Sequence, residues 1–228
     1  MTTIKVAFVV FCVVFSLWGC TTQKQREIAN NHLAIGVAYI ENGQDNLALQ
    51  ELLVAEKKDS SNERVHYFKG VVYINKKMMP DAIESFKRAI SEKSDYSQAR
   101  TYLGSIYTNM GDYDKAISQF KQAIANPLYE APSVALYNMA WAYFLKKDFE
   151  KAITANMQAL EKEPNSPLLA EIEACLGKIY FAIKDYQSSK AHYLKSLTIK
   201  PENDESLYGL AEVCLKTDNI ETARTMLT

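Results

Sequence analysis

The chain has 228 residues, of which 26 are Lys or Arg and 27 are Asp or Glu, giving a formal net charge of −1 at pH 7. Hydrophobic residues make up 48% of the sequence, enough for a folded domain. Because the charge is nearly balanced and no basic stripe stands out, nucleic acid is excluded as an expected partner.

The first 19 residues have the pattern of a signal peptide. Lys5 is followed by a run from Val6 to Leu17 that carries no charge. This run is too short for a membrane-spanning helix, which needs about 20 residues. Its length is typical of the apolar core of a signal peptide.

The run ends in Leu17-Trp18-Gly19-Cys20, which resembles the lipobox of bacterial lipoproteins. The resemblance implies that Cys20 is lipidated and becomes the first mature residue, with residues 20–28 as lipidated cysteine and polar tether. Because Thr21 rather than Asp follows the cysteine, it further implies an anchor on the periplasmic face of the outer membrane of a Gram-negative bacterium. The alternative is an uncleaved N-terminal anchor with an incidental cysteine.

Beyond the tether, residues of the same kind recur every 34 positions. Such a period is typical of a stacked array of helix pairs, in which small residues let paired helices approach and aromatic residues fill the space between pairs. The recurring residues are Gly36, Gly70 and Gly104; Tyr39, Tyr73 and Tyr107; Ala48, Ala82 and Ala116; and Ala55, Ala89 and Ala123.

This pattern resembles the tetratricopeptide repeat, which implies an all-α, right-handed superhelical solenoid of about six helix-turn-helix repeats. Two short insertions, Ala131-Pro132 and Pro167-Leu168-Leu169, interrupt the period. The array then covers residues 29–228, with repeats at 29–62, 63–96, 97–130, 133–166, 170–203 and an incomplete 204–228.

The turns inside the repeats support this division. A residue suited to capping a helix precedes several second helices, since its side-chain oxygen can accept from free backbone N–H groups. These residues are Asp112, Asp148, Asp185 and Asn219. Pro80 falls in a first helical turn, where a missing N–H costs little.

No catalytic motif is found. His32 and His66 occupy the same repeat position, but we find no acidic or cysteine partner recurring with them, and His192 stands alone. The sequence therefore predicts no enzyme, no metal site, no cofactor and no small-molecule substrate. Cys175 and Cys214 are expected as buried thiols, with a disulfide as the alternative.

The predicted working surface is a groove lined by the first helix of each repeat, at positions 2, 5, 9 and 12. In the fourth repeat, Met139, Ala140 and Tyr143 already supply the packing face, so Trp141 is in excess of the core; the alternative is that the curved array buries it. An apolar helix or strand of a partner protein is the expected ligand. The candidate groove residues are Tyr67, Val71, Ile74, Tyr137, Trp141, Phe144, Phe181 and Tyr208.

A lipobox followed by six such repeats resembles the outer-membrane lipoproteins of type IV pilus biogenesis, the pilotins of secretins. The segment Asn126-Pro127-Leu128-Tyr129, before the fourth repeat, is similar to an extended loop of that family. The resemblance implies a non-catalytic scaffold that binds a secretin subunit and aids its assembly. The alternative is an adaptor lipoprotein that docks cell-wall hydrolases or synthases.

Overall fold

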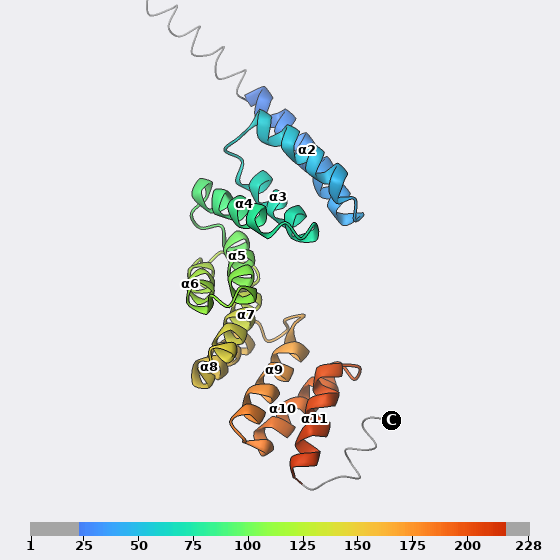
Figure 1. Ribbon diagram of the computed structural model, residues 1–228, viewed down its shortest axis with the longest axis vertical. Coiled ribbons are helices and arrows are strands. Elements are labelled where there is room, and N and C mark those ends of the chain that lie inside the picture. The colour runs from blue at the N-terminus through green and yellow to red at the C-terminus, as the bar shows by residue number, and fades with distance from the viewer. Residues whose placement is uncertain (1–22, 218–228) are drawn as a thin grey trace, which may run out of the picture. The chain divides into compact units, whose positions relative to one another are not determined.

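The computed structural model describes residues 23–217, which contain helices and turns and no strand (Figure 1). The predicted signal peptide, Cys20 and the cap residue Asn219 lie outside this range. The helices occupy residues 23–41, α2 Asp45–Lys58, α3 Glu63–Asn75, α4 Met79–Glu92, α5 Ser97–Asn109, α6 Tyr113–Ile124, α7 Pro132–Leu145, α8 Phe149–Lys162, α9 Leu169–Ala182, α10 Tyr186–Ile199 and α11 Asp204–Lys216. The predicted all-α class is confirmed.

The chain divides after Ala99 into two compact bodies, and helix α5 begins in one and ends in the other. In the N-terminal body the helix over residues 23–41 pairs with α2, and α3 pairs with α4. Its core joins the two pairs. That core consists of Leu33, Ala48, Leu52, Ala55, Val65 and Val72.

In the C-terminal body each helix from α6 to α11 packs against the next one in the chain. First helices also meet across repeats, because α9 contacts both α7 and α11. Alanines, Phe120, Leu136, Ile172 and Ile179 fill the main core of this body. The first helices of three successive repeats therefore lie side by side.

The 34-residue period follows from how closely the paired helices approach. A Cβ added at Gly70 would lie 2.7 Å from the Phe86 ring, and one at Gly177 would lie 2.7 Å from the Tyr193 ring. Ordinary carbon contacts are about 3.5 Å or longer. The recurring glycine of the first helix thus leaves room for the aromatic side chain of the second helix, because it has no Cβ.

Each described turn between paired helices contains a residue with positive φ at the same repeat position. Gly43 and Gly111 have φ of 70° and 79°, a conformation that glycine adopts freely. Three lysines hold it in the other repeats: Lys77, Lys147 and Lys184, with φ of 59°, 63° and 66°. Only two of these five turns are therefore marked by a glycine in the sequence.

The predicted helix caps in residues 23–217 are confirmed. Asp112, Asp148 and Asp185 accept from the backbone N–H three residues later, at 3.4, 3.4 and 3.0 Å. Asn62 and Asn203 cap the first helices α3 and α11 in the same way, although the sequence analysis does not predict these two caps.

The start of the array differs from the prediction. Residues 23–28, assigned to the polar tether, are helical and form the beginning of the helix over residues 23–41.

None of the helices described in residues 23–217 combines the length and the apolar character needed to cross a bilayer.

Candidate partner-binding surface

Three first helices of the C-terminal body present the residues of the predicted groove on adjacent surfaces. Helix α9 contacts α7 on one side and α11 on the other. We call this surface the first-helix face and define it by Tyr137, Trp141 and Phe144 of α7, Lys178 and Phe181 of α9, and Tyr208 and Leu215 of α11.

The aromatic residues of α7 form one cluster that is half-buried rather than freely exposed. The rings of Trp141 and Phe144 are stacked, with centroids 5.2 Å apart and an interplanar angle of 22°. Phe144 also meets Phe149 of α8 at 5.8 Å. Both the cluster and Tyr137 pack against the core of this body. Trp141 therefore contributes to packing as well as to the surface, an outcome between the two alternatives stated for this residue.

A lysine of the next repeat lies over this cluster. Lys178 Nζ is 4.9 Å from the centroid of the Trp141 ring and 2.5 Å from Glu205 Oε1 of α11. A cation over an indole face is attracted by the negative charge density of the ring. One side chain of α9 thus links the first helices of three repeats, and its charge is balanced by Glu205.

Tyr137 lies deeper on the same face. Burial is the main cause that raises its pKa above the usual value of 10.0, and Cys175, Glu205 and Glu171 add to the effect. The Tyr137 hydroxyl is therefore neutral at physiological pH and surrounded by groups of α9 and α11.

The α11 end of the face is the open part. Tyr208 is 67% exposed and Leu215 is 53% exposed, and Glu212 lies between them in sequence and is also exposed. Phe181 is half-buried against Tyr186 at 5.6 Å. Large apolar side chains that remain accessible beside charged ones are a typical feature of protein-binding surfaces.

Position 5 of the repeat is buried in the first, third and fifth repeats, although the prediction places it on the groove. Leu33, Thr101 and Ala174, all assigned to the groove, are buried. In the third repeat the cause is the loop before α7, because the Tyr129 hydroxyl is 3.1 Å from Thr101 Oγ1 and the ring is buried. The loop tip, Leu128, is 84% exposed. The groove at the third repeat is therefore partly filled by the chain itself.

The groove residues predicted in the N-terminal body are half-buried. Tyr67 belongs to an aromatic cluster, with ring centroids 5.0 Å from Phe68, 5.9 Å from Phe86 and 5.2 Å from Tyr96. Val71 and Ile74 lie on the same helix, α3. Tyr67, Val71 and Ile74 are therefore less accessible to a partner than Tyr208 and Leu215 of α11.

Each histidine faces a glutamate, which corrects the expectation that no acidic partner recurs with them. His32 Nδ1 lies 2.5 Å from Glu51 Oε2, and His192 Nδ1 lies 2.6 Å from Glu173 Oε2. His66 Nδ1 lies 3.6 Å from Glu56 Oε1. The signal was present in the spacing, since His32–Glu51 and Glu173–His192 are both 19 residues apart. No group of three or more His, Cys, Asp or Glu side chains in residues 23–217 is placed to hold a metal ion.

The two cysteines of the array are free and buried, as expected, so the disulfide alternative is not formed. Asn156 Nδ2 donates to Cys175 Sγ at 3.3 Å. Burial raises the pKa of the Cys175 thiol to about 11. Neither thiol is therefore exposed on the first-helix face.

A pocket of about 490 Å³ lies beside the turns that join α6 to α7 and α8 to α9. Its polar side chains already satisfy one another: Ser133 Oγ binds Glu163 and is 2.9 Å from Ser166 Oγ. Among the residues that line the pocket, only Val134 stands at a predicted groove position, position 2 of the fourth repeat, and we regard the pocket as a junction between repeats.

Two family models, both described as the tetratricopeptide repeat, match this chain. One covers residues 95–162, and the other covers residues 63–96 and 176–203. No curated protein matches the sequence.

Solved structures share the fold at low sequence identity. PilW, described as a widely conserved type IV pilus biogenesis factor, is 18% identical with a TM-score of 0.80, covering 87% of this chain and 90% of PilW. PilF of Pseudomonas aeruginosa is 18% identical with a TM-score of 0.78, covering 89% and 90%. YrrB, described as having an unusual peptide-binding site, is 18% identical with a TM-score of 0.64, covering 82% and 93%.

The helix pairs, their 34-residue period, the glycine–aromatic contacts and both family models agree. The chain belongs to the tetratricopeptide-repeat proteins.

Proposed function

We propose that this protein is a lipid-anchored, non-catalytic scaffold on the periplasmic face of the outer membrane, where it binds a secretin subunit and assists type IV pilus biogenesis. The observation that carries this proposal is the first-helix face of the C-terminal body. There, apolar side chains remain accessible on α11, and α9 connects this helix to the aromatic cluster of α7 that the core only half covers.

The chemistry of this face favours a partner segment with apolar side chains. Tyr208 and Leu215 lie seven residues, about two helical turns, apart on α11 and offer two accessible contacts. Trp141, under Lys178, offers a third that is already ordered by stacking. Because the Trp141 ring is already held by packing, little conformational entropy of this side chain is lost when a peptide binds it. A helix or an extended strand lying across α7, α9 and α11 fits this arrangement.

The fold comparisons support the cellular role. PilW and PilF match nearly the whole of this chain over nearly the whole of their own length, and PilW is a type IV pilus biogenesis factor. YrrB provides an example of a peptide-binding site on this fold. The lipobox at Leu17–Cys20 supports the lipid anchor.

The proposal is tested by affinity capture from detergent-solubilised envelopes with residues 21–228 as bait and mass spectrometry as readout. Three baits are compared: the unchanged sequence, Tyr208→Ala and Met157→Ala. Met157 is the matched control because it is 50% exposed on α8, a second helix outside the face. Substitutions at such exposed sites change stability by about 0.5 kcal/mol or less.

We expect the unchanged bait and Met157→Ala to capture a secretin and Tyr208→Ala to capture several-fold less. Cell-wall hydrolases or synthases captured in place of a secretin would contradict the pilus role and favour the adaptor function. Equal capture by all three baits would place the binding surface elsewhere on the array.

A further inference from the structure

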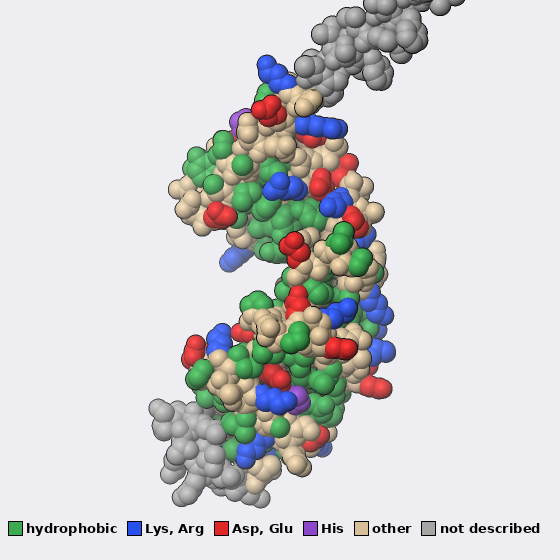
Figure 2. Space-filling model, turned by 180° about the vertical axis from the view of Figure 1, so that it is seen from behind, with side chains coloured by type: hydrophobic (Ala, Val, Ile, Leu, Met, Phe, Trp, Pro, Cys, Tyr) green, Lys and Arg blue, Asp and Glu red, His purple; other side chains and the backbone are tan. Residues whose placement is uncertain are grey.

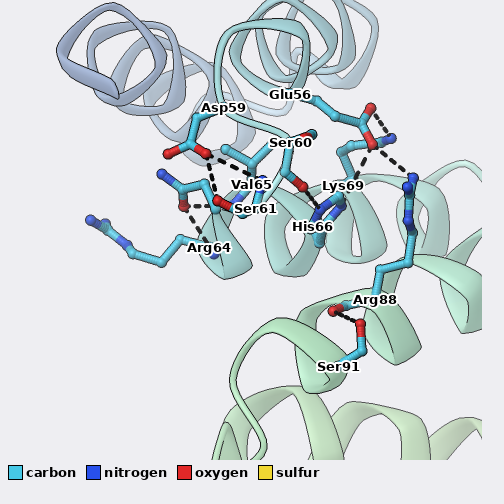
Figure 3. A network of polar contacts seen from close by, with 11 residues as sticks. Glu56, Asp59, Ser60, Ser61, Arg64, Val65, His66, Lys69, Arg88 and Ser91 are labelled. Carbon is cyan, nitrogen blue, oxygen red and sulfur yellow. Dashed lines mark hydrogen bonds and ion pairs between the residues drawn. The ribbon is translucent and has the colours of Figure 1, made fainter. Parts of the chain in front are cut away.

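The contacts between the first two repeats show which residues of a repeat face the preceding one. In Figure 3, two cations of the second repeat converge on one carboxylate of the first. Lys69 Nζ lies 2.6 Å from Glu56 Oε2, and Arg88 Nη1 lies 3.1 Å from Glu56 Oε1. Lys69 and Arg88 stand at positions 7 and 26 of their repeat. These two positions therefore belong to the stacking face.

In the first repeat the same positions hold apolar residues that remain exposed. Ile35 and Val54 lie 34 residues before Lys69 and Arg88 and are 45% and 38% exposed. Leu47, 34 residues before Asp81, is 41% exposed. A terminal repeat needs a polar outer surface to stay soluble. The first repeat instead presents an apolar one.

Two lysines extend this surface at one end. Along α2, Leu47, Val54 and Lys58 recur at seven and eleven residues, which places them on one side of the helix. Along the first helix, Lys24 and Ile35 are related by the same spacing of eleven. We call these five residues, Lys24, Ile35, Leu47, Val54 and Lys58, the outer face of repeat 1.

Both lysines lie at the end of the pair where the described chain begins. Arg26 Nε is 3.8 Å from Asp59 Oδ2, so the start of the first helix adjoins the end of α2. Figure 2 shows Lys and Arg side chains on the N-terminal body at this end, and hydrophobic side chains over the same helix pair. Apolar and basic groups thus share one surface.

The position of this surface in the chain indicates what covers it. Gln23, the first described helical residue, is three positions after Cys20, with Thr21 and Thr22 between them. A chain extends at most about 3.6 Å per residue, so about 11 Å is the longest possible separation. With a lipid on Cys20, the first repeat is therefore held at the bilayer surface.

We propose that the outer face of repeat 1 rests on anionic lipid headgroups, with Ile35, Leu47 and Val54 entering the interface and Lys24 and Lys58 meeting the negative charge. This inference rests on the lipid anchor in the proposed function. Apolar area combined with lysines is the composition by which amphipathic surfaces bind anionic membranes. The contact holds the helix pair of repeat 1 against the membrane.

The test uses the full chain, processed and purified from membranes in detergent and reconstituted into phosphatidylethanolamine–phosphatidylglycerol vesicles. Intact mass reports acyl groups on Cys20. A fluorophore is attached to Ile35→Cys or, as a control, to Met78→Cys, which is 38% exposed in the second repeat of the same body. Cys175 and Cys214 are buried and stay unlabelled in the native protein.

We expect a nitroxide lipid to quench the label at residue 35 several-fold more than the label at residue 78, and Lys24→Glu with Lys58→Glu to reduce the difference. Equal quenching at both residues in an acylated chain would overturn this inference while leaving the anchor intact. A label at 35 that is shielded from aqueous iodide but not quenched by nitroxide lipid would overturn it in favour of a protein cover. A chain without acyl groups would overturn the anchor and the inference together.

Discussion

The space around Tyr193 gives a quantitative test of how the last two described first helices pack. A Cβ built on Gly209 of α11 would lie 2.1 Å from Tyr193 Cζ and 2.5 Å from its hydroxyl oxygen. On the other side, a Cβ on Gly177 of α9 would lie 2.7 Å from the same ring. The ring is 3% exposed and is held between two glycines. It cannot move away from one without approaching the other helix.

Gly209→Ala is therefore expected to destabilise the array. The overlap is about 1.4 Å against an ordinary contact of about 3.5 Å. Overpacking of this kind costs about 1–3 kcal/mol or more, and the helix propensity of alanine returns about 1 kcal/mol. We expect a net loss of about 2 kcal/mol. For a chain of this length that loss lowers the melting temperature by about 4–8 °C.

The assay is thermal unfolding of residues 21–228, with amide hydrogen exchange to locate the loss in α10 and α11. Gly36→Ala is the control, since its nearest neighbour is the flexible Leu52 side chain at 3.1 Å. It should change stability by less than about 1 kcal/mol. In a Tyr193→Leu background, Gly209→Ala should become nearly neutral. If Gly209→Ala costs as much without the ring as with it, the reasoning fails.

Three further results are expected. Lys147→Gly, at φ of 63°, should raise the free energy of unfolding by about 1 kcal/mol, and Gly111→Ala, at φ of 79°, should lower it by about as much in denaturant titrations. Lys151, through its side chain and its backbone N–H, holds the pKa of the cap residue Asp148 below its usual value of 3.8. Because the pKa in the folded state is depressed, the stabilisation from this carboxylate is present above the unfolded-state pKa and is lost as pH falls through the folded-state pKa. The melting temperature of Asp148→Asn should therefore depend less on pH between about 5 and about 3 than that of the unchanged protein. Cys175 and Cys214 are both buried, and burial raises the pKa of Cys175 to about 11. A thiol reagent at pH 8 should therefore modify neither of these two thiols until the protein is unfolded, and their rapid modification in the native protein would contradict their burial.

The sequence predicted the helix pairs well because their cause is local and repeated. Gly70, Gly104 and Gly177 each face an aromatic ring sixteen residues later, and the same spacing recurs down the chain. The caps Asp112, Asp148 and Asp185 were predictable for the same reason. The lysines at positive φ were not, because nothing in the residue type marks that conformation.

The candidate site was predicted less completely, because its geometry depends on contacts between repeats. Lys178 lies over Trp141, 37 residues earlier, and pairs with Glu205, 27 residues later. Tyr129 reaches Thr101 through a loop whose path the sequence does not specify. Counting repeat positions assigns the groove to the first helices, but the depth of each side chain depends on the neighbouring repeat. For this reason Leu33 and Thr101 prove buried while Tyr208 is accessible.

The central claim is that a partner protein binds the first-helix face of the C-terminal body. The most direct measurement is site-specific photo-crosslinking in intact cells, with a photoreactive residue at Tyr208 or at Met157 and identification of the adducts by mass spectrometry. The account predicts a secretin adduct from residue 208 and none from residue 157. A secretin adduct from residue 157 alone, or no protein adduct from residue 208, would contradict it.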